Sequence, residues 1–166
     1  MLHIAQPGTT RNDASSLFQF TRLLLTRNGD NNRQVPMPPK KILIVDDEQE
    51  ICDLVQEGLR DAGYQVETAT TGKEGLEKAV RQKPDLIILD LHLPDMDGVN
   101  LYQELKNTQE HRETPVVFLT GLAQGTEPQR GNLESRIPYS ILPKPASVEE
   151  IEKEIRRLLA FRSSRA

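Results

Sequence analysis

DLIILDLHLPDMDG, at residues 85–98, joins a short apolar run to one polar residue, Asp90, and then to a turn. Three other apolar runs also lead into polar residues: 42–45 before Asp46 and Asp47, 116–119 before Thr120, and 141–142, which passes through Pro143 to Lys144. Runs of this length that are rich in β-branched residues, and that alternate with helical patterns, are typical of buried parallel strands. The sequence therefore predicts a parallel sheet whose strands end in chemically active groups.

The polar residues at these strand ends are expected to meet. In an open parallel α/β sheet all carboxyl ends share one edge, and ligands bind there. Asp46, Asp47 and Asp90 would then lie close together, and two unit charges at about 4 Å repel by roughly 4 kcal/mol at an effective dielectric near 20. A hard divalent cation with oxygen ligands relieves that repulsion, and Mg²⁺ is the natural candidate.

Strand and helix patterns alternate five times along the chain, and they predict the fold class. We expect helices at about 49–62, 71–82, 99–105 and 147–161, and one further strand at 64–69. Capping-box patterns mark two helix starts: Thr71 with Glu74, and Ser147 with Glu150. Five such units in series predict an α/β, flavodoxin-like, doubly wound sheet of five parallel strands in the order 2-1-3-4-5. Helical spacing also predicts that Leu54 and Val80 face the core.

The segment that should supply the remaining helix, residues 122–136, fits a helix poorly. It contains three residues that disfavour helices: Gly125, Pro128 and Gly131. Relative to alanine, glycine costs about 1 kcal/mol and an interior proline about 3 kcal/mol. We therefore expect a short or partly irregular helix in this segment.

The 166 residues divide into an N-terminal extension at 1–39, a domain at 40–161 and a tail at 162–166. The extension is expected to be mostly irregular, and it ends in a proline-rich lead-in to the first strand. Within it, residues 13–27 carry an apolar stripe at helical spacing. Such a helix either packs on its own domain without a functional role or serves in docking or dimerisation, so a homodimer is one alternative.

Composition limits the classes of partner and location. Of the 21 basic and 25 acidic residues, four and two fall in residues 1–38, which leaves 17 against 23 in the remainder. An acidic domain argues against direct binding of nucleic acid, because phosphate neutralisation supplies most of that affinity. The apolar runs are far too short to span a membrane, and the N-terminus lacks the pattern of a signal peptide. Cys52 is the only cysteine, which fits a reducing compartment, and we expect a cytoplasmic location.

Four motifs carry a resemblance to a known family: VDDE at 45–48, DLIILDLHLPDMDG at 85–98, PVVFLTG at 115–121 and LPKP at 142–145. Together they resemble the receiver domains of two-component response regulators, and in particular the stand-alone, CheY-like regulators. The motifs stand in the family's order and at about its spacing. The resemblance covers residues 39–161.

The resemblance implies that Asp90 is the phosphoacceptor. A sensor histidine kinase or a phosphotransfer protein would supply the phosphoryl group from a phosphohistidine. Lys144 would pair with Asp90 at rest and with a phosphoryl oxygen afterwards, and Thr120 would donate its hydroxyl to another phosphoryl oxygen. Positioning and electrostatic stabilisation do nearly all the catalysis in such transfers. The chain would catalyse its own phosphorylation and dephosphorylation, and is not expected to be an enzyme in the ordinary sense.

The same resemblance implies a Mg²⁺ site. Asp47 would be a direct ligand, Asp46 would act largely through water, and Asp90 and the backbone carbonyl of His92 would supply further oxygens. The His92 side chain is expected to line the mouth of the pocket and to tune the access of water. Residues 95–98 also suggest a Ca²⁺ loop, but they are too few for the twelve-residue loop and are better explained as a turn and a helix start.

The output of the domain is expected to depart from the family's usual pattern. In the family, an aromatic residue three positions before the lysine swings from exposed to buried on phosphorylation. Ile141 holds that position here, and the nearest aromatic residue is Tyr139. Few residues follow the last predicted helix, so we expect signalling through contact with a downstream protein target.

Two other functions remain open at this point. A receiver-like binding or adaptor module would keep the fold, dock without phosphorylation, and retain its partner after Asp90→Asn. A Mg²⁺-dependent phosphatase of another α/β family would use Asp90 as its nucleophile. That chemistry requires a second aspartate two residues later as general acid, where His92 stands.

Overall fold

The computed structural model of the chain describes residues 38–121 and 139–164. The helix predicted at 13–27, nearly all of the predicted extension at 1–39, and the irregular helix predicted at 122–136 lie outside these residues. The described part contains five strands: β1 (Lys41–Val45), β2 (Gln65–Ala69), β3 (Leu86–Asp90), β4 (Val116–Thr120) and β5 (Tyr139–Pro143). Each lies within a residue or two of the run that predicted it.

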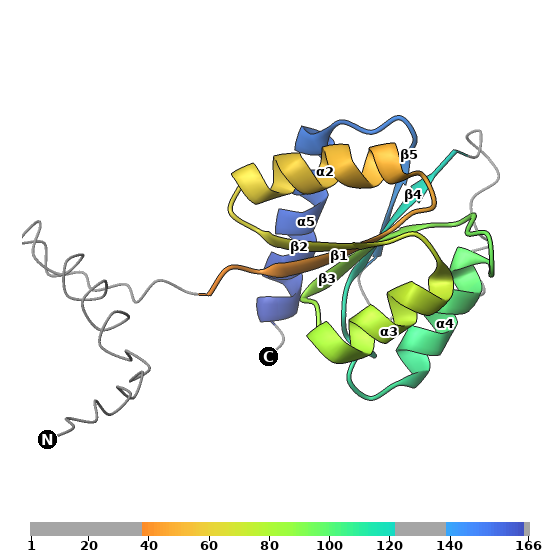
Figure 1. The fold of residues 1–166 in the computed structure, drawn as a ribbon. Helices are drawn as coiled ribbons and strands as arrows, with labels where there is room; N and C mark the ends of the chain where they lie inside the picture. Colours follow the sequence, from red (N-terminus) through yellow and green to blue (C-terminus); the bar gives the residue numbers. More distant parts are fainter. Residues whose placement is uncertain (1–37, 122–138, 165–166) are drawn as a thin grey trace, which may run out of the picture. The chain divides into compact units, whose positions relative to one another are not determined.

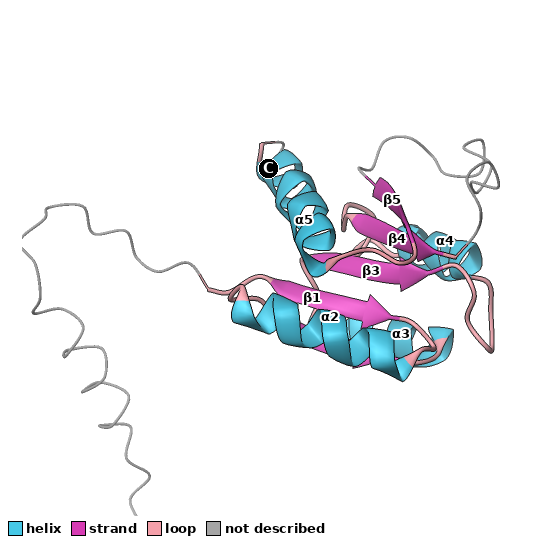
Figure 2. Ribbon diagram, turned by 90° about the horizontal axis from the view of Figure 1, so that it is seen from above, coloured by secondary structure: helices cyan, strands magenta, loops and turns pink. Residues whose placement is uncertain are grey.

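The five strands form one sheet in the order β2-β1-β3-β4-β5, and every neighbouring pair is parallel. Figure 2 shows β1 and β3 side by side and running in the same direction. The residues of β1, β3 and β4 are buried almost throughout, as their continuous apolar runs require in a sheet covered on both faces. The predicted fold class and strand order are confirmed.

Within residues 38–121 and 139–164, four helices cover the two faces of the sheet: α2 (Gln49–Asp61), α3 (Gly72–Gln82), α4 (Gly98–Asn107) and α5 (Val148–Ser163). Side chains alternate between faces along a strand, so Ile88 packs with α2 and α5, whereas Ile87 and Leu89 pack with α3 and α4. Figure 1 shows α2 and α3 on opposite sides of the sheet. None of the helices in the described residues is long and apolar enough to span a membrane.

Local sequence signals explain where the helices begin and end. Ser147 and Glu150 form the full capping box that the sequence predicted at the start of α5. At the start of α3, Thr71 accepts a hydrogen bond from the Glu74 backbone as predicted, but the Glu74 carboxylate accepts from the Thr70 backbone instead of that of Thr71. The predicted box is therefore only half formed there.

Two core predictions are wrong, because the inward face of each helix is narrower than the apolar pattern suggests. Leu54 is 62% exposed and Val80 is 48% exposed. In α2 the buried positions are Cys52, Val55 and Leu59. Successive residues of a helix are rotated by about 100°, so Leu54 points away from the sheet while its neighbour Val55 points into it.

Replacing Ile88 by alanine should destabilise the domain strongly. Ile88 is 1% exposed at the centre of β3, and truncating such a residue removes apolar contacts and leaves a cavity. We expect the free energy of unfolding in a denaturant titration to fall by about 2–5 kcal/mol. Leu54→Ala is the matched control on the exposed side of α2 and should change it by less than about 0.5 kcal/mol. Equal losses in the two variants would contradict the assigned core.

Candidate functional site

The parallel strands bring four polar residues to one edge of the sheet. Asp46 directly follows β1, Asp90 and Thr120 end β3 and β4, and Lys144 directly follows β5. Asp46 is 1% exposed, and Asp90 and Thr120 are each 5% exposed. In the sheet, Asp90 stands opposite Leu119, next to Thr120 in the chain. Residues far apart in sequence therefore form one buried polar group at the carboxyl edge.

Lys144 lies at the centre of this group. Its Nζ lies 2.7 Å from Asp90 Oδ2, 2.8 Å from Asp46 Oδ2 and 3.0 Å from Glu48 Oε1. Its backbone N–H donates to the carbonyl of Thr120 at 2.7 Å, which fixes the lysine beside the end of β4. Burial alone lowers the pKa of Lys144, but its close contacts with the three carboxylates raise it above its ordinary value. The ammonium group is therefore charged at neutral pH.

Asp46 is the most deeply buried carboxylate of the group. Its Oδ1 accepts a hydrogen bond from the Glu48 backbone at 3.0 Å. Its Oδ2 is close enough to Lys144 for an ion pair, but it accepts no well-directed hydrogen bond from the described residues. Burial raises the pKa of Asp46, and the lysine opposes that shift. One buried carboxylate oxygen is thus left with unused capacity as an acceptor.

Asp90 is held through both of its carboxylate oxygens. Oδ2 accepts from the Lys144 ammonium, and Oδ1 accepts from the His92 backbone N–H at 3.2 Å. The His92 side chain is exposed, so this residue faces the site with its backbone. The side chain of Asp90 is therefore oriented jointly by the cation that follows β5 and by an amide in the loop after Asp90 itself.

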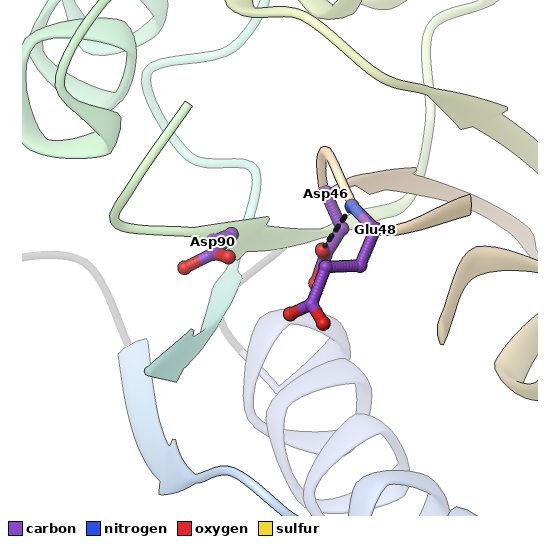
Figure 3. A group of neighbouring side chains, drawn as sticks. All are labelled: Asp46, Glu48 and Asp90. Atoms are coloured by element: carbon purple, nitrogen blue, oxygen red, sulfur yellow. Dashed lines mark hydrogen bonds between the residues drawn. The ribbon is translucent and has the colours of Figure 1, made fainter. Parts of the chain in front are cut away.

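Three carboxylates fit the requirements of a hard divalent cation. Asp46, Glu48 and Asp90 each offer one oxygen, and these oxygens all lie within 4.8 Å of one another. Figure 3 shows the three side chains at the ends of β1 and β3. Carboxylate oxygens are the ligands that Mg²⁺ prefers. Together with the under-used Oδ2 of Asp46, this donor set is compatible with a Mg²⁺ ion that would share the carboxylates with Lys144.

The structure brings together Asp46, Asp90 and Lys144, as the sequence predicted for the strand ends. Asp47, which the resemblance implied as a direct metal ligand, is exposed and lies outside the group of three carboxylates. The roles predicted for Asp47, Thr120 and the carbonyl of His92 stay predictions. Glu48 was missed, although it is the acid that completes the VDDE motif.

Cys52 offers no competing nucleophile at this edge of the sheet. It is fully buried in α2, and its thiol donates to the backbone carbonyl of Asp46 at 3.4 Å. Burial raises the pKa of Cys52 to about 11, so the reactive thiolate is scarce at neutral pH. The thiol packs beneath the acidic group as an apolar side chain.

Gly98 allows the backbone after Asp90 to close tightly. A Cβ atom at this position would lie 2.1 Å from the backbone oxygen of Asp90 and 2.8 Å from the Cα of Leu91. Both are backbone atoms, which cannot move away by a simple side-chain rotation. The first residue of α4 therefore approaches the end of β3 more closely than any side chain permits.

Comparison with known sequences gives one family across most of the chain. The sequence profile described as response regulator receiver domain matches residues 42–156. The DNA-binding dual master transcriptional regulator RpaA of Synechocystis is 41% identical over 119 residues, which are 72% of this chain and 48% of that protein. The alkaline phosphatase synthesis transcriptional regulatory protein PhoP of Bacillus subtilis is 38% identical over 120 residues, with the same coverage. The chain thus spans about half the length of these curated relatives.

Solved structures agree with the sequence comparison. The chemotaxis protein CheY4 of Vibrio cholerae is 33% identical with a TM-score of 0.66, over 72% of this chain and 98% of that one. A CheY-like receiver domain protein of Methanospirillum hungatei is 29% identical with a TM-score of 0.69, over 77% and 99%. The receiver domain of the sensor histidine kinase PA1611 of Pseudomonas aeruginosa, solved with a magnesium ion in its active site cleft, is 26% identical with a TM-score of 0.64, over 74% and 98%.

Replacing Gly98 by alanine should disturb the end of β3. The added methyl group would collide with the backbone of Asp90 and Leu91, so the strand or the helix start must move. We expect a loss of about 1–3 kcal/mol in the free energy of unfolding, as for other overpacked sites. Gly121→Ala is the matched control, because none of the described residues has an atom within 4 Å of the corresponding Cβ position. A Gly98→Ala variant as stable as Gly121→Ala would refute the close approach.

Proposed function

This chain belongs to the response regulator receiver domain family, and we propose that it accepts a phosphoryl group on Asp90. The donor would be the phosphohistidine of a sensor histidine kinase or of a phosphotransfer protein. The observation that carries this proposal is the distance of 2.7 Å between Lys144 Nζ and Asp90 Oδ2, in a group that also contains Asp46. A carboxylate held between a fixed cation and a backbone amide is oriented for attack on an incoming phosphorus.

The proposed transfer is a simple substitution. A carboxylate oxygen of Asp90 attacks the phosphorus, the new O–P bond forms as the P–N bond of the phosphohistidine breaks, and the electron pair leaves on the imidazole nitrogen. Charge spreads over the three phosphoryl oxygens in the transition state. Lys144 would turn from the Asp90 carboxylate to one of these oxygens, and Thr120 would donate its hydroxyl to another. Thr120 ends β4 and Lys144 directly follows β5, so both residues already lie at the edge of the sheet that carries Asp90.

A Mg²⁺ ion is part of this proposal. Asp46, Glu48 and Asp90 would hold it. The resemblance to the family adds Asp47 and the His92 carbonyl to the proposed ligands. When bound, the ion supplies positive charge beside the phosphoryl oxygens and offsets the mutual repulsion of the carboxylates. The magnesium described for the PA1611 receiver domain supports a similar role here.

The signal would leave through a change of charge and of contacts. Phosphorylation replaces about one negative charge by two and adds strong hydrogen-bond acceptors. Ile141 stands opposite Phe118 in the sheet, and Tyr139 packs edge-on against the same phenyl ring with 6.2 Å between ring centroids. Tyr139 is thus already engaged with the core, so we propose that the response does not rest on a swinging aromatic residue in β5.

Several further predictions from the sequence belong to this proposal. The chain would act as a phosphoacceptor that catalyses its own modification, and a downstream protein would read its state. Stand-alone action without an output domain, a cytoplasmic location, homodimerisation and the absence of direct nucleic-acid contact stay predictions. The matched half of RpaA and PhoP belongs to proteins named as transcriptional regulators.

Incubation with a small phosphodonor such as acetyl phosphate and Mg²⁺ should add one hydroxylamine-labile phosphate, because an acyl phosphate forms on Asp90. Asp90→Asn should remove the modification, as measured by intact-protein mass spectrometry. Asp53→Asn, on the exposed side of α2, is the control and should be modified like the wild type. Modification of Asp90→Asn to the wild-type extent, or of neither protein, would contradict the proposal. Unchanged partner binding by Asp90→Asn would favour a phosphorylation-independent adaptor.

Mg²⁺ should stabilise the folded domain, since the carboxylate group exists only in the native state. At a free concentration of 100 times Kd, the free energy of unfolding should rise by about 2.7 kcal/mol. Asp46→Asn should weaken Mg²⁺ affinity by about tenfold or more, in line with the loss of a buried ligand. Glu57→Gln on α2 should leave the affinity unchanged. Thermal unfolding at several Mg²⁺ concentrations measures both, and equal shifts in the two variants would exclude Asp46 from the metal site.

A further inference from the structure

The loop that follows Asp90 is tied to a helix that precedes it in the chain. Asp95 accepts hydrogen bonds from the backbone N–H groups of Gly72, at 2.7 Å to Oδ1, and of Lys73, at 3.0 Å to Oδ2. These are the first two N–H groups of α3, which have no partner within the helix. Both oxygens of one exposed carboxylate are thus used to connect residues that are 23 and 22 positions apart.

The helix has its own cap, so these bonds are additional. Thr71 is the N-cap of α3, and its hydroxyl accepts from the Glu74 backbone. Asp95 satisfies different donors, and it comes from the loop between β3 and α4. The contact therefore contributes little that α3 requires in order to begin at Gly72. Its distinctive effect is to fix the position of the loop.

Met96 completes the contact beside Asp95. A Cβ atom built on Gly72 would lie 2.6 Å from Met96 Sδ and closer still to Met96 Cγ, so a side chain at residue 72 would displace Met96 from the start of α3. Met96 also packs against the core cluster that lies between the sheet and the helices α3 and α4. One polar and one apolar contact therefore hold the same tip of the loop.

The base of the loop is equally well defined. His92 and Asp97 form an isolated antiparallel bridge, and the Gly98 N–H donates to the Leu91 carbonyl at 2.8 Å. The Asp97 side chain caps α4 by accepting from the Val99 backbone at 2.7 Å. The backbone N–H of His92 donates to Asp90 Oδ1. A continuous set of contacts therefore runs from the start of α3, through the loop, to the carboxylate of Asp90.

We propose that Asp95 is a positioning residue for the reaction at Asp90. By fixing the loop at residues 91–97 against α3, its carboxylate would hold the His92 amide where it orients Asp90 Oδ1. This inference rests on the proposed function, and it gives a role to the DMDG sequence that follows Pro94. The two backbone N–H groups, that of Lys73 first, also hold the pKa of Asp95 below its ordinary value, so the acceptor is ionised at neutral pH.

Asp95→Asn tests the proposal with little change of volume. An amide offers one oxygen, and its NH₂ group would face a backbone N–H that is also a donor. Thr71→Ala is the first control, because it weakens the start of α3 without touching the loop. Asp97→Asn is the second, because it lies in the same loop and asparagine caps a helix as well as aspartate does. Together the controls separate lost stability from lost positioning.

Two measurements on the full chain decide the outcome. In hydrogen exchange without metal or phosphodonor, the amides of residues 91–98 should exchange about tenfold faster in Asp95→Asn than in either control. With acetyl phosphate and Mg²⁺, the maximal rate of Asp90 phosphorylation should fall by about tenfold in Asp95→Asn alone, with the half-saturating donor concentration unchanged.

The possible failures are distinguishable. If Asp95→Asn matches Thr71→Ala in both measurements, or matches the wild type, Asp95 has no positioning role, while the proposed function stands as long as the wild type is phosphorylated on Asp90. If the wild type is not phosphorylated at all, the proposed function itself fails, and the role in that reaction fails with it.

Discussion

Lys144 balances three carboxylates at one buried edge of the sheet, and the arrangement of the site depends on that balance. Its ammonium group reaches Asp46, Asp90 and Glu48 at distances between 2.7 and 3.0 Å. Removing one partner from a buried ion pair costs about 3–5 kcal/mol, because the remaining charge is left without compensation. Because the strands are parallel, β1, β3, β4 and β5 all end at this edge of the sheet. The fold is thus the means by which distant residues share a single cation.

A site of this kind is suited to an exchange of partners. The lysine neutralises the carboxylates at rest, and a divalent cation or a phosphoryl group would redistribute those contacts without rebuilding the sheet. Asp90 would keep its orientation during such an exchange, because the His92 amide donates a hydrogen bond to its Oδ1. The loop bearing that amide is itself held by Asp95 and Met96 against α3. Phosphoryl transfer relies on positioning and electrostatic stabilisation. It therefore requires rigid support around an ion pair that can change its partners.

The sequence predicted the sheet well, since its strands are short apolar runs with unmistakable polar ends at Asp46, Asp90 and Thr120. It predicted Leu54 and Val80 poorly, because both lie one helical step from buried positions and only packing decides which of two apolar neighbours turns inward. Glu48 was not predicted as a site residue, because its position at the start of a helix is enough to explain an acidic residue there. The contact of Asp95 with α3 could not be foreseen, because nothing local shows that a turn residue will meet a helix 23 positions earlier.

The central claim is that Asp90 and Lys144 are energetically coupled in the resting domain, and a double-mutant cycle measures this most directly. The wild type, Asp90→Asn, Lys144→Met and the double variant would be unfolded with denaturant in the absence of divalent cations. We predict that the two substitutions are non-additive in the free energy of unfolding by at least about 1 kcal/mol, as expected for residues in direct contact. Additivity to within about 0.3–0.5 kcal/mol, the behaviour of distant and independent sites, would contradict the claim.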